Sequence, residues 1–521
     1  MLDAKKVILT LADNTTNTIT DSSRLSTEED YSAAIYSKED LIINGNGTLN
    51  VNAGYRNGIK STDDCIIVSG TLNITSTEDG IIGKDLCGIV AGDININAGS
   101  DGIKSTYDTD TTKGNVIIEG GNITIKASND GIQAENILVI NDGTINIKTN
   151  NGAADTTQTH IDNMDMGRGG FGFNNNKTTT TTDDTSESRK GIKAGNMLII
   201  NDGDITIDSD DDSVHCNSEI YIYGGTINAA TGDDGVHADD LLTVNGGTIN
   251  ITQCYEGIEA DDIVINDGDI SVVSSDDGIN SSDGSITING GNLLINASGD
   301  GLDANGSIII NGGYIVVLGP TSDGDTAIDY DDSCTINGGT VMAFGSSGML
   351  EIPKGASNGA CIVTAFTSVS GGSKYTLSDS NGNEILSYTP SKAYAAAIVY
   401  SDKITTGNTY NITAGSTTLS IEVTSDVTSN VSSGFGGAGG MNKPGNGGSG
   451  MPNNGSSDNG MNGNSNGSMP DMSGNGAPDM NGNSSGDMPS MGGNSSNNGG
   501  NMPNMNNGSS NGSAPQMNNR M

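Results

Sequence analysis

Acidic side chains recur at a fixed interval in the middle of the chain, and they are the residues best suited to chemistry. Asp233 and Asp239 flank a short apolar segment, and the equivalent places one interval away hold further acids. Carboxylate oxygens are preferred ligands of Ca²⁺, which takes about six to eight oxygens. We therefore expect a calcium site shared by adjacent repeats, with ligands drawn from Asp211, Asp233, Asp239, Glu259, Asp261 and Asp303. The alternative is a solvated acidic face without a metal.

A second set of acids directly precedes the small residue that opens each repeat. Asp before Gly is common in turns, where its carboxylate accepts backbone N–H groups. That role explains a single residue, but stacked carboxylates repel one another unless a cation or a shared proton lies between them. The set comprises Asp79, Asp101, Asp130, Asp212, Asp234, Glu256, Asp277 and Asp300.

Histidine, tyrosine and lysine side chains lie on the same stretch. His215 and His237 are one interval apart, but no third His or Cys accompanies them, so a zinc site is the weaker interpretation. The predicted polysaccharide contacts are His215, His237 and Tyr255, with Tyr221, Tyr223 and Tyr314 as further platforms. A lyase would also need a Lys or Arg base, for which Lys104 and Lys193 are the candidates, although solvated charges are the simpler interpretation.

These residues are positioned by a repeat of about 22 residues. Gly191, Ser213, Gly235 and Gly257 fall at steps of 22. Each repeat holds alternating segments such as LLTVN and TINIT, joined by a DG or GG turn, and period-2 alternation is typical of strands. Three short strands and three turns then make one coil of an all-β, right-handed parallel β-helix, whose coils stack at roughly 4.8 Å. Asn residues before the turns are expected to bond to one another along the stack.

Composition changes divide the chain. Residues 1–345 are expected to form the β-helix, interrupted by a mobile insertion at 150–189. Residues 346–425 have a different rhythm, which predicts a small antiparallel β cap over the exposed strand edges. Residues 431–521 are rich in Gly, Asn, Ser, Met and Pro and predict a disordered tail. The chain opens already in strand rhythm and shows no signal peptide, so we expect an N-terminal truncation.

Charge and cysteine content limit the partners. The chain has 64 acidic and 22 basic residues and a net charge of −42, which argues against nucleic acid and anionic membranes. No apolar stretch is long enough for membrane insertion, and we expect a monomer. Cys65 and Cys87 are 22 residues apart, so small buried side chains in adjacent coils are favoured over a disulfide.

The repeats DGIKS, DDGVHADDLLTVNGGTINIT and CYEGIEADDIVINDGDI resemble those of secreted clostridial carbohydrate-binding domain-containing proteins. The resemblance covers about 1–425 and implies a pectate-lyase-like right-handed β-helix outside the cell. It also implies bound Ca²⁺ and plant cell-wall glycans such as cellulose or polygalacturonate as ligands. We therefore expect an extracellular, calcium-binding polysaccharide-binding protein. The alternatives are a calcium-dependent pectate or polysaccharide lyase and a passive cell-surface scaffold or adhesin.

Overall fold

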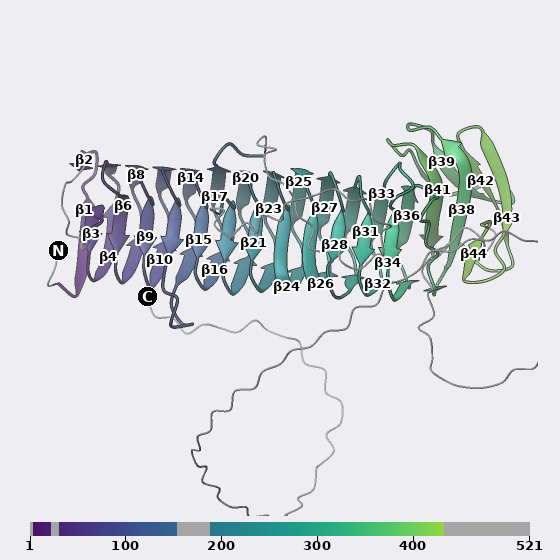
Figure 1. Ribbon diagram of the computed structural model, residues 1–521, viewed down its shortest axis with the longest axis horizontal. Coiled ribbons are helices and arrows are strands. Elements are labelled where there is room, and N and C mark those ends of the chain that lie inside the picture. Colours follow the sequence, from purple (N-terminus) through teal and green to yellow (C-terminus); the bar gives the residue numbers. More distant parts are fainter. Residues whose placement is uncertain (1–3, 22–30, 154–187, 432–521) are drawn as a thin grey trace, which may run out of the picture. The chain divides into compact units, whose positions relative to one another are not determined.

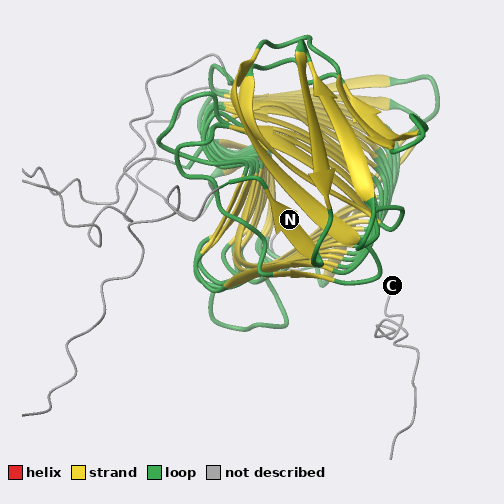
Figure 2. Ribbon diagram, turned by 90° about the vertical axis from the view of Figure 1, so that its right-hand side faces the viewer, coloured by secondary structure: helices red, strands yellow, loops and turns green. Residues whose placement is uncertain are grey.

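The computed structural model describes residues 4–21, 31–153 and 188–431, and these residues form a parallel β-solenoid of about 13 turns (Figure 1). They contain strands and no helix, and so no helix that could cross a membrane. Each regular coil has three strands, and equivalent strands of successive coils pair in parallel to form three columns. Figure 2 looks along this stack and shows the coils behind one another. The predicted all-β parallel β-helix is confirmed.

The strands of the three columns have the following bounds. The first column comprises β3 (Ala33–Ser37), β6 (Asn57–Ser61), β9 (Ile81–Gly83), β12 (Ile103–Ser105), β15 (Ile132–Ala134), β18 (Ile192–Ala194), β21 (Val214–Cys216), the first parts of β24 (Val236–Val244) and β26 (Ile258–Ile265), β28 (Ile279–Ser281), β31 (Leu302–Ala304) and β34 (Ile328–Tyr330). The second comprises β1 (Lys6–Leu11), β4 (Asp40–Gly45), β7 (Asp64–Ile67), β10 (Leu86–Ile89), β13 (Asn115–Ile118), β16 (Ile137–Ile140), β19 (Met197–Ile200), β22 (Glu219–Ile222), the last parts of β24 and β26, β29 (Ile286–Ile288), β32 (Ser307–Ile310), β35 (Ser333–Ile336) and β37 (Gly355–Ala356). The third comprises β2 (Thr16–Asp21), β5 (Thr48–Ala53), β8 (Thr71–Ser76), β11 (Asp93–Ala98), β14 (Asn122–Ala127), β17 (Thr144–Thr149), β20 (Asp204–Ser209), β23 (Thr226–Thr231), β25 (Thr248–Cys254), β27 (Asp269–Ser274), β30 (Asn292–Asn296), β33 (Tyr314–Leu318) and β36 (Thr340–Gly345).

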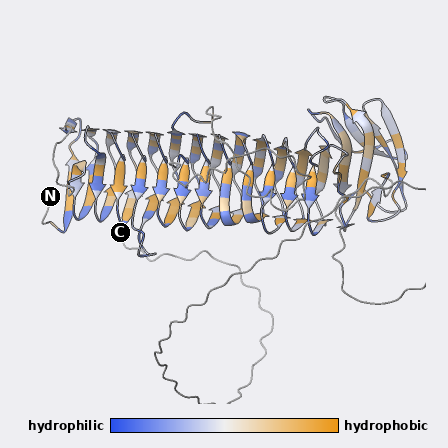
Figure 3. Cartoon of the chain, in the orientation of Figure 1, coloured by the Kyte–Doolittle hydropathy of each residue, from blue (hydrophilic) through white to orange (hydrophobic). Residues whose placement is uncertain are grey.

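The core is a set of aliphatic ladders inside the coils. Val214 pairs with Val236, which pairs with Ile258, and all three side chains are fully buried. Successive side chains of a strand point to opposite faces, so every second residue enters this core. Figure 3 shows the hydrophobic and hydrophilic residues along the strands of the coils. Cys65 and Cys87 are register partners on β7 and β10, and all six cysteines of the chain are buried and free. The preference for ladder positions over a disulfide is therefore confirmed.

The predicted asparagine ladder is present at the turn that follows the second column. Asn266 donates to Asn245 (2.9 Å), and Asn289 donates to Asn266 (2.8 Å). The ladder continues through Asn311 and Asn337 at 2.9 and 3.0 Å. The turns themselves need glycine because Gly247 and its equivalents have positive φ.

We predict that Asn289→Ala lowers the free energy of unfolding by about 1 kcal/mol, because it removes two side-chain hydrogen bonds from the ladder. Asn245→Ala is the matched control, because Asn245 makes a single ladder bond among the described residues, which it accepts from Asn266. Urea unfolding should show a clearly smaller loss for the control. Equal losses in the two variants would argue that the ladder bonds are energetically neutral.

A separate antiparallel sheet follows the solenoid, as predicted. Its strands are β40 (Glu384–Tyr388), β39 (Tyr375–Asp379), β42 (Thr409–Ala414) and β43 (Thr417–Glu422). The third column itself ends when β41 (Tyr394–Ser401) pairs antiparallel with β36, followed by β38 (Ala360–Val369) and β44 (Val427–Ser429). Phe344 of β36 packs on Tyr375 of β39. Both faces of β36 are buried, which explains why period-2 alternation fades there.

Two predicted segments fall largely or wholly on residues that the structure does not describe. Most of the insertion predicted at 150–189 lies outside the described residues, and so does nearly all of the tail predicted at 431–521. The mobility of the first and the disorder of the second stay predictions.

Candidate functional site

The first column carries two rows of mostly polar side chains, here called the back row and the front row. The back row is the residue before each coil's small opening residue, and the front row is the outward residue in the middle of each strand. Asp212 and His215 are a back-row and front-row pair, and so are Asp234 and His237. Along the stack the front row runs Lys60, Ile82, Lys104, Gln133, Lys193, His215, His237, Glu259, Asn280, Asp303 and Asp329. Its charge therefore changes from positive to negative along the solenoid.

The back-row acids perform the turn role expected of them. The backbone N–H of Asp130 donates to Asp101 Oδ1 (3.0 Å), and that of Asp234 donates to Asp212 Oδ1 (3.1 Å). The same bond links Asp300 to Asp277 (2.6 Å). One oxygen of each of these carboxylates thus binds the next coil, which leaves the other oxygen to face the front row.

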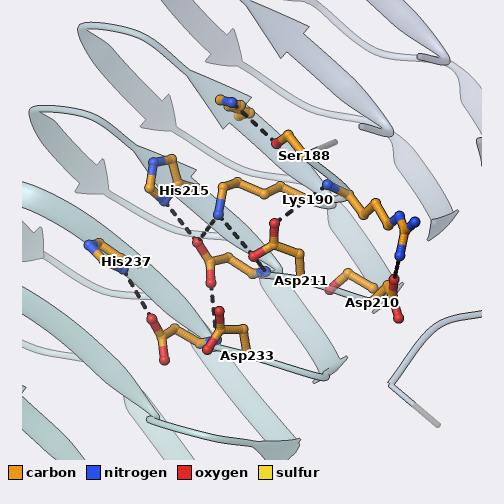
Figure 4. A network of polar contacts seen from close by, with 12 residues as sticks. Ser188, Lys190, Asp210, Asp211, His215, Asp233 and His237 are labelled. Carbon is orange, nitrogen blue, oxygen red and sulfur yellow. Dashed lines mark hydrogen bonds and ion pairs between the residues drawn. The ribbon is translucent and has the colours of Figure 1, made fainter. Parts of the chain in front are cut away.

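In the middle of the column the protein supplies its own cations. Lys190 Nζ lies 3.0 Å from Asp211 Oδ1 and 2.5 Å from Asp212 Oδ2 (Figure 4). Burial acts to raise the pKa of Asp212, but the charge of Lys190 and the hydrogen bond from His215 outweigh it and hold this pKa well below its usual range. Asp233 lies in the same cluster, and burial together with the charge of Asp234 raises its pKa to about 8.

His237 is the second internal cation. Its Nδ1 lies 3.0 Å from Asp234 Oδ2 and 3.1 Å from Glu259 Oε2, and its Nε2 lies 3.5 Å from Asp239 Oδ1. Burial acts to lower the pKa of His237, but hydrogen bonds to Asp234 and Asp239 outweigh it and raise the pKa to about 12. His237 and the nearly buried His215 therefore both contact carboxylates through Nδ1. The centroids of their rings lie 5.0 Å apart.

Further along the column a third cluster has carboxylates alone. Asp277, Asp300 and Asp303 bring ligand oxygens within 4.8 Å of one another. Burial raises their pKa values to about 8, 9 and 7, and the charges of neighbouring acids act in the same direction. Among the described residues no Lys, Arg or His forms an ion pair with these three. Among the described residues these three carboxyl groups therefore have no protein cation to neutralise them when they ionise.

A buried hydroxyl extends this carboxylate cluster. Thr326 follows Asp300 in the back row and donates its backbone N–H to the Asp300 carboxylate. Its Oγ1 is buried and has no hydrogen-bond partner among the described residues. Thr326 comes three residues before Asp329 of the front row, the same spacing that separates Asp212 from His215. This coil therefore offers a buried oxygen without a partner among the described residues, in addition to the three carboxyl groups, and oxygen atoms are the ligands that Ca²⁺ takes.

The predicted metal ligands thus do not form one site. Asp211 and Asp233 share the Lys190 cluster, Asp239 and Glu259 flank His237, and Asp303 lies in the carboxylate cluster. Asp261 accepts a hydrogen bond from Ser282 (3.1 Å) and belongs to none of these clusters. The sequence did not indicate that Lys190 neutralises Asp211 and Asp212, although Lys190 occupies a back-row position where neighbouring coils have Asp.

The other predicted residues are also placed. Tyr255 is half-buried and donates its backbone N–H to Asp233 O (2.7 Å). Lys104 pairs with Asp101 at 2.6 Å; burial acts to lower its pKa, but the charge of Asp101 outweighs it and raises the pKa, the opposite of what a general base needs. Lys193 donates to Ser188 (3.2 Å).

The outward face of the second column forms a different kind of surface. Thirteen register partners follow one another there, and most have aliphatic side chains at least partly exposed: Ile8, Ile42, Ile66, Gly88, Ile117, Val139, Ile199, Tyr221, Thr243, Val264, Thr287, Ile309 and Thr335. We call this the apolar row. At about 4.8 Å per coil it extends for roughly 58 Å. The row can be recognised in the sequence because the second strand of a coil has apolar residues at its outward as well as its inward positions, as in ILVI and MLII.

An aromatic pair stands in the middle of the apolar row. The rings of Tyr221 and Tyr223 stack with centroids 6.5 Å apart, and Tyr223 is 49% exposed. Tyr223 occupies the ladder position between Asn201 and Asn245, as its backbone bond to Ile200 shows. This coil therefore gives up its place in the asparagine ladder and exposes an aromatic ring.

Comparison with known proteins gives one family. A family model described as carbohydrate-binding domain-containing protein matches residues 1–235 and 233–382. A protein of Acetivibrio thermocellus with the same description is 39% identical over 75 residues, which are 14% of this chain and 26% of that protein. The matched part thus spans about a quarter of that relative's length. No solved structure matches.

Proposed function

The chain belongs to the family of carbohydrate-binding domain-containing proteins, and from this premise we propose that it is an extracellular polysaccharide-binding protein whose ligand lies on the apolar row. The observation that supports this most is the Tyr221–Tyr223 pair. Tyr223 stands where neighbouring coils have a ladder asparagine, so this coil has an exposed aromatic ring in place of an amide hydrogen bond. Sugar rings present C–H groups on their faces, and aromatic rings with one polar end suit contacts of this kind.

The apolar row favours a neutral glycan of the plant cell wall, such as cellulose. The chain carries a net charge of −42, so an anionic polymer is repelled unless a cation intervenes. The long straight row matches a polymer better than a small sugar. Polygalacturonate is the second ligand of the proposal, and it requires Ca²⁺ between its carboxylates and those of the protein.

For this Ca²⁺ we propose the carboxylate cluster of Asp277, Asp300 and Asp303. Its donors are all oxygens, and it has no protein cation among the described residues. Thr326, whose buried Oγ1 has no hydrogen-bond partner among the described residues, donates its backbone N–H to Asp300. Ca²⁺ is a hard ion that takes oxygen ligands and supplies the missing positive charge. The Lys190 and His237 clusters fit Ca²⁺ less well because their carboxylates already face cations.

The test is retention on insoluble cellulose and a gel shift with polygalacturonate, each with Ca²⁺ and with a chelator. We expect Tyr223→Ala and Tyr221→Ala to weaken cellulose binding by about tenfold, since tyrosine anchors at binding surfaces typically cost more than about 1 kcal/mol when truncated. Tyr314→Ala is the matched control, because Tyr314 is 44% exposed but lies on the third column.

The outcomes separate the proposal from its alternatives. If both tyrosine variants are retained on cellulose as well as wild type, the glycan binds a face other than the apolar row. A rise in ultraviolet absorbance of the polygalacturonate sample would reveal a lyase. No retention under any condition would leave a scaffold or adhesin.

A further inference from the structure

We propose that His237, Asp234 and Glu259 form a binding site for a divalent transition metal of the zinc class. This site is separate from the carboxylate cluster proposed for Ca²⁺ and does not depend on glycan binding. The three residues come from neighbouring coils of the first column, where rigid parallel pairing sets their spacing. His237 and Glu259 are register partners on β24 and β26, and Asp234 lies in the turn before β24.

The three ligand atoms already converge. One imidazole nitrogen, Nδ1 of His237, faces both Asp234 Oδ2 at 3.0 Å and Glu259 Oε2 at 3.1 Å. All three atoms lie within 4.8 Å of one another. Zinc bonds of about 2.0–2.2 Å to nitrogen and oxygen in a tetrahedron place neighbouring ligands about 3.3 Å apart. The ion therefore needs only small movements of side chains, but it must displace the proton on Nδ1, so binding should strengthen as pH rises.

The second ring nitrogen supports the same assignment. His237 Nε2 lies 3.5 Å from Asp239 Oδ1. Histidines that bind metals almost always donate their other N–H to a carboxylate or carbonyl, which fixes the tautomer and the ring orientation. Asp239 thus stands where a supporting carboxylate belongs, while Nδ1 is directed toward the two ligand carboxylates.

Charge at the site also favours a divalent ion. A single proton on Nδ1 is shared by two carboxylates. A divalent ion in the place of that proton would supply two positive charges to the two carboxylates instead of one. The donor set selects the kind of metal, because imidazole nitrogen suits zinc and its neighbours whereas Ca²⁺ takes oxygens.

Calorimetric titration of the full chain with Zn²⁺ in the presence of excess Ca²⁺ tests the site. We expect His237→Gln and Glu259→Gln each to weaken Zn²⁺ binding at least about tenfold. Asp300→Asn is the control and should keep wild-type affinity for Zn²⁺, because Asp300 belongs to the carboxylate cluster and not to this site. Cu²⁺ electron paramagnetic resonance should show nitrogen coupling that disappears in His237→Gln.

Three results would overturn the proposal. They are no Zn²⁺ binding by the wild-type chain, binding unchanged in both His237→Gln and Glu259→Gln, and a loss in Asp300→Asn as large as in those variants. Circular dichroism confirms that each variant is folded. Glu259→Gln keeps the proposal testable if His237→Gln fails to fold, because it retains the size of the side chain.

Discussion

Lys190→Met should lower the free energy of unfolding by about 3–5 kcal/mol, the cost of leaving a buried charge without its partner. Lys190 contacts both Asp211 and Asp212, and the Asp212 side chain is almost fully buried. Methionine fills a similar volume but brings no charge, so Asp212 must either remain ionised in an apolar environment or take up a proton. Urea unfolding at neutral pH measures the loss.

The pH dependence of this loss follows from the lowered pKa of Asp212. A depressed carboxyl pKa stabilises the fold above the ordinary value of 3.8 and ceases to do so as pH falls through the folded-state value. The difference between wild type and variant should therefore be largest at neutral pH and shrink in acid. Lys374→Met removes a surface ion pair with Glu384 at 3.1 Å and should cost less than about 1 kcal/mol. A similar loss in both variants would contradict the internal-cation role of Lys190.

Calcium should stabilise the protein by about 2.7 kcal/mol at a hundredfold excess over its dissociation constant, if the carboxylate cluster binds it. Without Ca²⁺, Asp277, Asp300 and Asp303 hold protons more tightly in the folded state, with pKa values raised from 3.8 to about 8, 9 and 7. The folded state then binds more protons than the unfolded state, so stability should fall as pH rises from about 4 to 9. Thermal unfolding in a chelator measures this slope, and Ca²⁺ should oppose it.

Asp300→Asn gives this prediction its sharpest form, because the sign of its effect reverses. At pH 8 in a chelator the variant should be more stable than wild type, since one repelling carboxylate is gone. With Ca²⁺ it should be less stable, since a ligand is gone. Asp283→Asn is the control because Asp283 is an exposed acid outside the cluster. If Asp300→Asn is stabilised equally with and without Ca²⁺, Asp300 is not a ligand of the ion.

The fold was predictable because the solenoid repeats one local rule. A step of 22 residues puts Val214, Val236 and Ile258 in register, and period-2 alternation decides which side chains enter the core. Ser213 and Cys216 could be placed the same way, from their neighbours in the column. The cap was recognisable because its alternation differs, and β36 shows why, since both of its faces are buried.

The candidate site was less predictable because charge neutralisation depends on contacts between coils. The acids along the column look alike in the sequence, yet Asp211 meets Lys190, Glu259 meets His237 and Asp303 meets only other carboxylates among these clusters. The apolar row was overlooked because alternation was assumed to put polar residues outside on every strand. Tyr223 was among the predicted platforms, and a comparison of ladder positions would have singled it out because it stands between asparagines.

The antiparallel strand β41 has a consequence for growth of the stack. A parallel solenoid presents at its last coil an edge that an identical first coil could extend in register, and repeated addition would build a filament. At β36 that edge is occupied by a strand running the opposite way, bonded from Thr340 to Gly345. An incoming parallel strand finds neither the direction nor the free backbone groups it needs, so the third column cannot polymerise from this end.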